Sequence, residues 1–481
     1  MLTYQDYEAA VAENRVAAFI CSAIANHRQS EAYLTAVDAD LYDHRKNVTV
    51  NTYTRLIQEK TRNPLVDITA ANNRIASNFF RRLNTQRCAY SLGNGVTFTN
   101  KEERCSRRGL PIQVDVTKER LGQKFDTDLY RWAYKALIHG VAFGFWNLDR
   151  LYVFPLTEFV PLWDEDTGAL RAGIRFWQLD REKPMTAVLY TEDGYTTYRT
   201  RSGSGGMDFA TEDEAPRPYI VTVTSTGAGG EVIAGTDSYG ALPIVPMWGS
   251  SLKQSTLVGM REQIDSYDLI QSGFANDLHD CAQIYWIIQN CGGMTDEDLQ
   301  RFLDNLRVNH IAQVDTDSFG GDGGDAKQAL SPYTQDVPHV ARHTFLQGMR
   351  GEIYEAFGAL DVHSIYASST NDHIDAAYQP MDEEADDFEY QIIEAVQQVL
   401  ELIGIEDTPQ FKRNRVSNIK ETIEAVMLET SVLGQRKTLE KLPNVTVDEV
   451  EEIMLDDFSN GLHRLNYEPL KNAGGGEGGA V

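Results

Sequence analysis

The sequence has few of the features that mark secreted, membrane-spanning or metal-binding proteins. Its five cysteines are an odd number and none are spaced as CxxC, so neither a disulfide framework nor a zinc site is expected. The most apolar short run, residues 282–288, is far shorter than the roughly 20 residues that cross a bilayer. No basic segment leads into an apolar one at the N-terminus, which predicts no signal peptide. We therefore expect a chain that folds in a reducing cytoplasm, without a membrane partner.

Local signatures of catalysis are also missing. The sequence contains no GxSxG, HExxH or Walker A motif and no paired Cys or His ligands at metal spacing. A stretch at 315–320 resembles the start of a calcium loop, but Phe319 occupies a ligand position and Ala326 stands where a bidentate Glu is needed. We predict no enzymatic activity, no cofactor and no bound metal.

Positive charge is in the minority. The 481 residues include 44 Lys and Arg against 71 Asp and Glu, a formal net charge of −27. This balance excludes a protein that binds nucleic acid over its whole surface, because that affinity comes mainly from Lys and Arg. It remains compatible with a protein that lets nucleic acid pass without gripping it. Hydrophobic residues at 42% exclude wholesale disorder, and the length corresponds to about three domains at roughly 150 residues each.

Hydrophobic patterning predicts a mixed α+β fold that is mainly helical. Helices are predicted near the N-terminus and at two later segments, and a β-rich region follows. The clearest hairpin joins 187–192 to 195–198 through Asp193-Gly194, since Asp-Gly suits a two-residue turn. The predicted helices of this half span residues 1–45, 72–88 and 126–140.

Two long helices are predicted in the second half. The first, about 256–289, carries an apolar stripe at steps of three or four residues and is roughly 50 Å long. The second spans 336–357 and has its own stripe. Such length with a narrow stripe is typical of helices that pack against similar neighbours. The predicted packing residues are Tyr267, Ile270, Phe274, Leu278 and Tyr285 in the first helix, and Leu346, Met349 and Ile353 in the second.

The remaining segments are assigned by composition. A compact insertion at 290–335 contains a predicted strand at 309–314, and a polar stretch follows at 361–375. An acidic helix is predicted at 382–403; its block at 382–389 is read as a solvated helix face rather than a pair of catalytic carboxylates. Two further helices are expected at 419–433 and 446–457, before a flexible Gly-rich tail.

The order of these pieces resembles a known family. Leu242-Pro243-Ile244-Val245-Pro246 leads into the long helix with Ile264-Asp265-Ser266-Tyr267-Asp268, and the second long helix precedes the Ser/Thr/Asn-rich stretch. Earlier, 89–96 resembles a Tyr-x-x-Gly-x-x-Val segment, and 437–443 resembles a C-terminal segment of the same family. In these features the chain is similar to the portal proteins of tailed double-stranded DNA bacteriophages, the type found in siphoviruses, over about residues 30–460.

This resemblance implies a portal fold with long stem helices, a small α/β clip, a β-containing wing and a helical crown. It implies a ring of about twelve copies at one capsid vertex of the virion, assembled in the host cytoplasm, through which double-stranded DNA passes. The implied regions are an N-terminal helical segment 1–45, a wing 46–250, stem helix 251–289, clip 290–335, stem helix 336–357, tunnel loop 358–376, a second wing part 377–418 with an acidic helix and return strand, a crown 419–470 and the tail 471–481.

The resemblance also implies sites and partners. Terminase, head-completion or adaptor proteins, and the major capsid and scaffolding proteins would be partners. The tunnel-loop residues expected in the DNA channel are His363, Ser368, Ser369, Thr370, Asn371 and His373. The clip residues expected to contact terminase or adaptors are Asp296, Glu297, Asp298, Arg301, Arg307 and Asp315. Two alternatives stay open: another ring-forming head–tail connector, and an acidic cytosolic enzyme.

Overall fold

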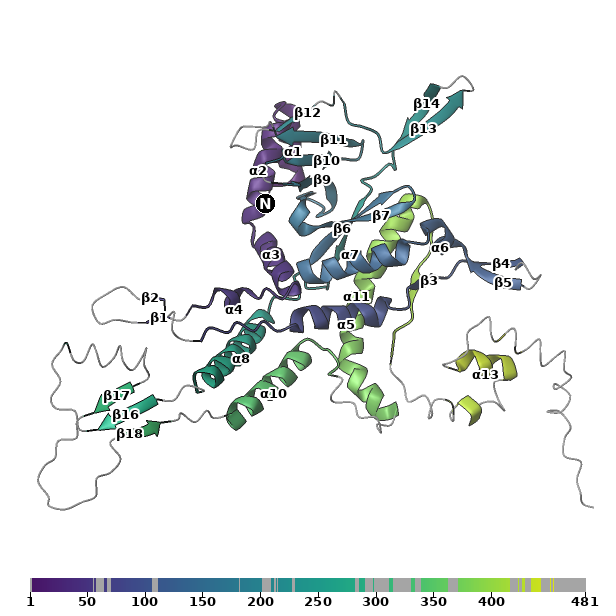
Figure 1. Cartoon of the computed structure of the whole chain (residues 1–481). Helices are drawn as coiled ribbons and strands as arrows, with labels where there is room; N and C mark the ends of the chain where they lie inside the picture. Colours follow the sequence, from purple (N-terminus) through teal and green to yellow (C-terminus); the bar gives the residue numbers. More distant parts are fainter. Residues whose placement is uncertain are drawn as a thin grey trace, which may run out of the picture. The chain divides into compact units, whose positions relative to one another are not determined.

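The chain divides into two compact units, Met1–Leu360 with Pro380–Asn414, and Asp361–Gln379 with Arg415–Val481. Every strand that the structure describes lies in the first unit (Figure 1). The computed structural model describes residues 2–54, 56–57, 65–66, 71–105, 111–180, 182–200, 209–211, 213, 215–226, 230–281, 285–289, 297, 311–314, 330–333, 339–361, 371–415, 423, 426–428, 434–442, 450 and 453.

Helices and strands are interleaved along the chain, so the predicted mixed fold class is confirmed, while the division into wing, stem, clip and crown stays a prediction. The helices are α1 (Tyr4–Ala12), α2 (Val16–Gln29), α3 (Glu31–Asp43), α4 (Val48–Thr52), α5 (Phe79–Leu92), α6 (Val116–Leu121), α7 (Phe125–His139), α8 (Arg261–Cys281), α10 (His339–Ala356), α11 (Asn371–Ile403) and α13 (Gln435–Lys441). The strands are β1 (Leu56–Ile57), β2 (Leu65–Val66), β3 (Val96–Phe98), β4 (Lys101–Cys105), β5 (Pro111–Asp115), β6 (Val141–Asn147), β7 (Arg150–Pro155), β8 (Phe159–Trp163), β9 (Leu170–Trp177), β10 (Thr186–Tyr190), β11 (Tyr195–Thr200), β12 (Phe209–Thr211), β13 (Ile220–Thr226), β14 (Gly230–Asp237), β15 (Ile244–Trp248), β16 (Tyr285–Gln289), β17 (Ile311–Val314), β18 (Leu330–Tyr333) and β19 (Pro409–Phe411).

The predicted N-terminal helical segment consists of three helices, α1 to α3. Thr3 caps α1 in a capping box, in which its side chain accepts the Asp6 N–H and the Asp6 side chain accepts the Thr3 N–H. Ser30 separates α2 from α3 and caps α3. The apolar face of α2, including Phe19 and Ile20, packs on the five-stranded sheet described next.

Strands β8 to β12 form an antiparallel sheet in the order β12-β11-β10-β9-β8. Its β10–β11 pair confirms the predicted hairpin. The tight turn lies one residue earlier than predicted, with Glu192 and Asp193 at its centre, because the Thr191 N–H donates to the Gly194 carbonyl at 2.9 Å.

The centre of the first unit is α7 on a three-stranded sheet of order β15-β6-β7. The Trp132 indole N–H donates to the Ala142 carbonyl at 2.9 Å. A Cβ at Gly144 would lie 2.7 Å from the Trp132 ring, so only glycine lets the strand approach this closely. Phe388 and Ile392 of α11 complete this core.

The predicted long helix at 256–289 is wrong at both ends, since α8 covers only Arg261–Cys281. Residues 285–289 form β16, the central strand of a sheet of order β17-β16-β18. The run Tyr-Trp-Ile-Ile has high strand propensity, and a short apolar run does not distinguish helix from strand by spacing alone. The strand predicted at 309–314 is confirmed as β17.

The acidic helix is longer than predicted. It begins at Asn371 rather than Asp382 and contains Pro380 in its interior. Proline removes one helical hydrogen bond and usually kinks or ends a helix. However, the buried residues Ile374, Tyr378 and Met381 continue the apolar stripe through this position. Residues 371–376, predicted as part of a loop, are therefore helical.

Two other helix predictions change. The helix expected at 72–88 begins at Phe79, and residues 71–78 are not helical. Of the two expected C-terminal helices, the described residues 423, 426–428, 450 and 453 are helical, and α13 at Gln435–Lys441 was not predicted. In the part of the chain that the structure describes, no helix is both long and apolar enough to cross a bilayer.

Candidate functional site

Helices α8 and α10 are neighbours in the fold and contact each other (Figure 1). Near the end of α8, Arg342 of α10 forms an ion pair with Asp277, and its guanidinium lies 5.9 Å from the centre of the Phe274 ring. Because this contact joins the C-terminal part of α8 to the N-terminal part of α10, the two helices are antiparallel.

The other end of the pair is held by aromatic contacts. Phe79 of α5 contacts the Tyr267 ring edge-on at 4.9 Å and the Tyr354 ring at 6.2 Å. Ile264 and Ile353 are fully buried in the same cluster. This end of both helices is therefore part of the chain's own core.

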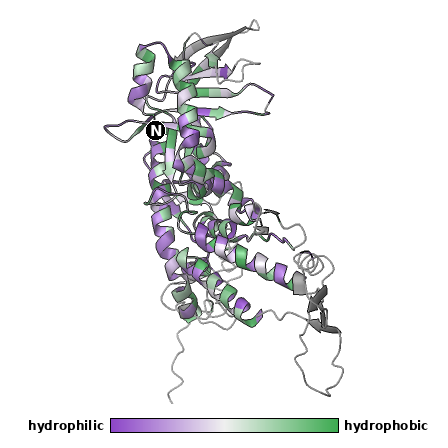
Figure 2. Cartoon of the chain, turned by 90° about the vertical axis from the view of Figure 1, so that its left-hand side faces the viewer, coloured by the Kyte–Doolittle hydropathy of each residue, from purple (hydrophilic) through white to green (hydrophobic). Residues whose placement is uncertain are grey.

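Burial decreases along the helix pair toward the end of α8 and the start of α10. Leu278 is 52% exposed, Phe345 53% and Val340 67%. Hydrophobic and hydrophilic residues alternate along the helices (Figure 2). Exposed apolar side chains that form a contiguous patch are typical of a surface that packs against another protein.

The predicted packing residues differ in burial. Leu346 and Ile353 are buried, and Leu278 is exposed. Tyr285 was placed on the wrong element, because it lies on β16 and not in the helix. Those that are partly buried are Tyr267, Ile270, Phe274 and Met349.

A second face of α8 binds the non-helical segment 71–78 through three hydrogen bonds. The side chains of Asp268, Ser272 and Asn276 accept the backbone N–H groups of Ser77 at 2.9 Å, Ile75 at 2.9 Å and Asn73 at 2.6 Å. The acceptors are four residues apart and the donors two apart, in opposite directions. We call this set of bonds the α8 ladder.

Two aspartates of α8 extend these contacts to the N-terminal helices. Asp265 accepts from the Tyr42 hydroxyl and the Thr49 hydroxyl, both at 2.5 Å. Asp268 also accepts from the Asn47 amide. Burial raises the pKa of Asp268, while the bonds from Ser77 and Asn47 oppose this shift. The polar face of α8 is thus an attachment surface within the chain.

The acidic block of α11 is not simply a solvated face. Arg413 donates to Asp382 and Glu389 at 3.0 Å and forms an ion pair with Asp386. Hydrogen bonds that Arg413 donates to Glu389 and Asp386, partly opposed by burial, raise the pKa of Arg413. The Tyr90 hydroxyl also donates to Asp382 at 2.6 Å. Through Arg413, these carboxylates attach the segment that follows α11 to α11 itself.

Comparison with known proteins identifies the family. Residues 23–457 match the family model described as "Phage portal protein, SPP1 Gp6-like". The chain belongs to this family of phage portal proteins. A portal protein of Clostridium phage phiCD119 is 25% identical over 430 residues, covering 84% of this chain and 88% of that protein. A portal protein of Bacillus phage SPP1 is 22% identical over 438 residues, covering 85% of this chain and 81% of that protein.

A solved structure described as "Neck of native GTA particle computed with C12 symmetry" is also similar, at 8% identity over 77% of this chain and 91% of that chain. Its TM-score of 0.37 is too low to establish a common fold. Family membership confirms the expectation of a phage portal for DNA packaging. Portal proteins of this family are structural rather than enzymatic, and they are components of the virion.

Most of the predicted portal contact residues lie outside the described residues. This holds for His363, Ser368, Ser369 and Thr370 of the expected tunnel loop, and for Asp296, Asp298, Arg301, Arg307 and Asp315 of the expected clip. Glu297 is described and exposed. Asn371 and His373 lie in the first turn of α11 and not in a loop, and His373 is exposed.

Sequence reasoning missed the residues that connect elements of the portal chain. Ser272, Asn276 and Arg413 show no motif, and their partners are far away in the sequence. One signal in the sequence is the polar face of α8 opposite its apolar stripe, which carries Asp265, Asp268 and Asn276. Among the described residues, no group of three or more His, Cys, Asp or Glu is placed to hold a metal ion.

Proposed function

We propose that about twelve copies of the chain form a ring at one vertex of the capsid and that double-stranded DNA enters and leaves through its centre. The observation that supports this most directly is the exposed apolar end of the α8–α10 pair, with Leu278, Val340 and Phe345 unburied in the single chain. A ring uses heterologous contacts, in which one patch packs on a different patch of the next copy. The exposed end of the pair would be one of those patches.

In this proposal the helix pair is the stem of the portal. The stem comprises 251–289 and 336–357, with α8 and α10 as its helical parts. Residues 290–335 would be the clip; they contain β17 and β18, which pair with β16 at the end of the stem segment. The wing would be 46–250 with 377–418, the tunnel loop 358–376 and the crown 419–470.

An acidic channel wall would favour movement of DNA over binding. Duplex DNA carries one charge per ~1.7 Å, so a passage as long as the 21-residue α8, about 32 Å, holds on the order of 20 phosphates. Rings of lysine facing them would bind tightly and slow transport. The net charge of −27 per chain instead supports repulsion, screened over about 8 Å at physiological salt.

Weak polar contacts would act at the narrowest point of the channel. We assign this role to His363, Ser368, Ser369, Thr370, Asn371 and His373. Terminase, and later head-completion proteins, would dock on the clip through Asp296, Glu297, Asp298, Arg301, Arg307 and Asp315. Capsid and scaffolding proteins would surround the ring.

Electron microscopy and native mass spectrometry of the purified full-length chain test the proposal. Annular particles with a mass of about twelve chains are the expected result. Compact single particles at every concentration tested would contradict it. A second measurement concerns the channel: deletion of 363–373 should leave rings intact and reduce DNA retention in assembled heads.

A further inference from the structure

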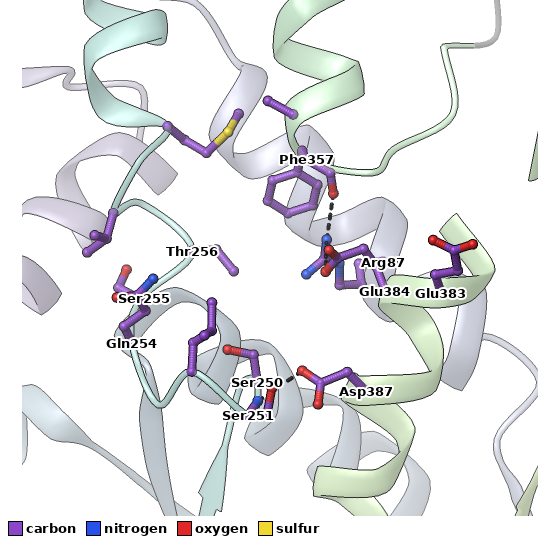
Figure 3. A pocket seen from close by; sticks show the side chains of 14 residues that line it. Arg87, Ser250, Ser251, Gln254, Ser255, Thr256, Phe357, Glu383, Glu384 and Asp387 are labelled. Carbon is purple, nitrogen blue, oxygen red and sulfur yellow. Dashed lines mark hydrogen bonds and ion pairs between the residues drawn. The ribbon is translucent and has the colours of Figure 1, made fainter. Parts of the chain in front are cut away.

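Arg87 of α5 lies between the end of α10 and the middle of α11 (Figure 3). Its guanidinium donates to the Phe357 carbonyl at 2.6 Å and forms an ion pair with Glu384 at 3.0 Å. The same guanidinium lies 4.2 Å from the centre of the Phe357 ring. The Arg87 side chain is only 9% exposed, whereas that of Glu384 is 48% exposed, so the ion pair lies at the edge of the buried region.

Neighbouring residues add to the same connection. Gln86 donates to the Leu360 carbonyl at 3.0 Å, so two successive side chains of α5 bind the turn that follows α10. Gly358 in this turn has φ +63°, and a Cβ there would lie 2.7 Å from Cγ of Glu384. The turn and α11 therefore touch directly beside the Arg87 ion pair.

These contacts lie at the two points where the chain leaves and re-enters the first compact unit. Leu360 is the last residue before the exit, and Pro380 is the first after the return. Phe357 and Leu360 lie just before the exit, and Glu384 lies one helical turn after the return. Arg87 thus binds both roots of the same segment.

Packing alone does not fix α11 on this side. A cavity of about 520 Å³ lies between the loop before α8 and α11, and Arg87, Glu384 and Asp387 are among its lining residues. The polar contacts drawn there are those of Arg87 and the bond from the Ser251 N–H to Asp387 at 2.9 Å (Figure 3). The cavity side of α11 is thus contacted by hydrogen bonds and an ion pair, while Met381, Ala385 and Phe388 of the same stretch are buried.

We infer that Arg87 is a positioning residue that couples the end of α10 to α11 and so fixes the two roots of segment 361–379 relative to each other. Both contacts are made by Nη2 of the guanidinium. The planar guanidinium holds its N–H groups in fixed directions, whereas the N–H groups of a lysine ammonium rotate on a flexible stem. If the proposed function is correct, this coupling holds the base of the tunnel loop in the ring. The coupling itself does not depend on that function.

Hydrogen–deuterium exchange of the full-length protein tests the coupling. The reporter amides are Phe357, Gly358 and Ala359, which are bonded to carbonyls of α10, and residues 381–387 of α11. In Arg87→Met, both reporters should exchange about tenfold faster or more, as expected for loss of charged hydrogen bonds. Arg87→Lys should restore only part of the protection. Faster exchange of 357–359 alone would reduce Arg87 to a cap of α10 and overturn the inference.

Glu384→Gln keeps the test informative if Arg87→Met fails to fold, because the Glu384 side chain is 48% exposed. Its effect should reach residues 357–359 through Arg87. The matched control is Glu401→Gln, an exposed carboxylate of the same helix that forms no ion pair within the described residues. Unchanged exchange at 357–359 in Glu384→Gln would overturn the coupling. Native mass spectrometry of the same samples reports separately on ring formation. Failure of the proposed function can therefore be distinguished from failure of the coupling.

Discussion

Ser272 of α8 accepts the backbone N–H of Ile75 at 2.9 Å, and this bond is the middle one of the three in the α8 ladder. Four residues of α-helix advance about 6.0 Å, and two residues of extended chain advance about 6.6 Å. This near match lets acceptors spaced four apart meet every second N–H of an antiparallel extended segment. The ladder therefore satisfies the donors of 73, 75 and 77 without a helix or a sheet.

Removal of the middle acceptor should loosen the whole segment. Ser272 is 5% exposed, so Ser272→Ala leaves the Ile75 N–H without its partner at a cost of about 1–3 kcal/mol. Amide exchange of residues 73–77 should accelerate by roughly 5- to 100-fold. Ser266→Ala, at an exposed position of the same helix, is the control. Equal exchange in the two variants would show that the ladder does not hold the segment.

The same ladder explains one failure of sequence-based prediction. The spacing of Ile75, Phe79 and Leu83 predicted a helix from residue 72, and the part from Phe79 onward is confirmed. The start was wrong because residues 73–77 bond to side chains of α8 about 200 residues away. Local periodicity contains no information about such partners.

A similar limit applies to the stem and its neighbours. The stripes of α8 and α10 were predictable because they depend on spacing within one helix. The strand at 285–289 was missed because its identity depends on pairing with β17 and β18. Arg87 and Arg413 were missed because a single arginine has no sequence signature, and their roles depend on which helices meet.

Asp407 should make stability depend on pH in the acidic range. Its carboxylate accepts from the Thr99 N–H at 3.1 Å, the Asn100 N–H at 3.2 Å and the Thr117 hydroxyl at 2.7 Å. Burial alone would raise the pKa of Asp407, but the hydrogen bonds from Thr99, Thr117 and Thr408 lower it to about 2. A lowered pKa in the folded state contributes stability above the unfolded value of about 3.9, and this contribution is lost as the pH falls toward about 2.

The comparison of Asp407→Asn with the unmodified chain measures this contribution. The variant should be less stable at pH 7, on the order of 1–3 kcal/mol, and the difference should shrink as the pH is lowered from about 5 to about 3. Urea unfolding followed by tryptophan fluorescence gives the two midpoints at each pH. Asp149→Asn, at an exposed site, serves as the control. A difference that stays constant over this range would refute the assignment.

Arg413 should contribute to the stability of the fold, because its guanidinium is shared by three carboxylates of α11. Arg413→Met leaves Asp382, Asp386 and Glu389 on one helix face without it. Loss of these charged hydrogen bonds should cost on the order of 2 kcal/mol and lower the melting temperature. Because the remaining repulsion is screened by salt, 0.5 M NaCl should restore part of the loss. Arg415→Met, which loses the contact to Asp375, is the matched arginine control, and an identical salt response in both variants would remove the special role of Arg413.

Phe345 provides the sharpest test of the stem surface. Its side chain is 53% exposed on α10, so Phe345→Glu should leave the fold of the single chain intact. In a ring, the same side chain would pack on the next copy, and burial of a Phe contributes about 1.5–3 kcal/mol. The variant should therefore assemble at least about tenfold less well, as measured by mass photometry over a concentration series, while its melting temperature as a monomer is unchanged.

Leu179→Glu makes the same kind of change at a position that is 81% exposed and outside the helix pair, and it should assemble normally. If Phe345→Glu and Leu179→Glu form rings equally well, the exposed end of the α8–α10 pair is not the contact between copies, and the stem assignment has to move to another surface.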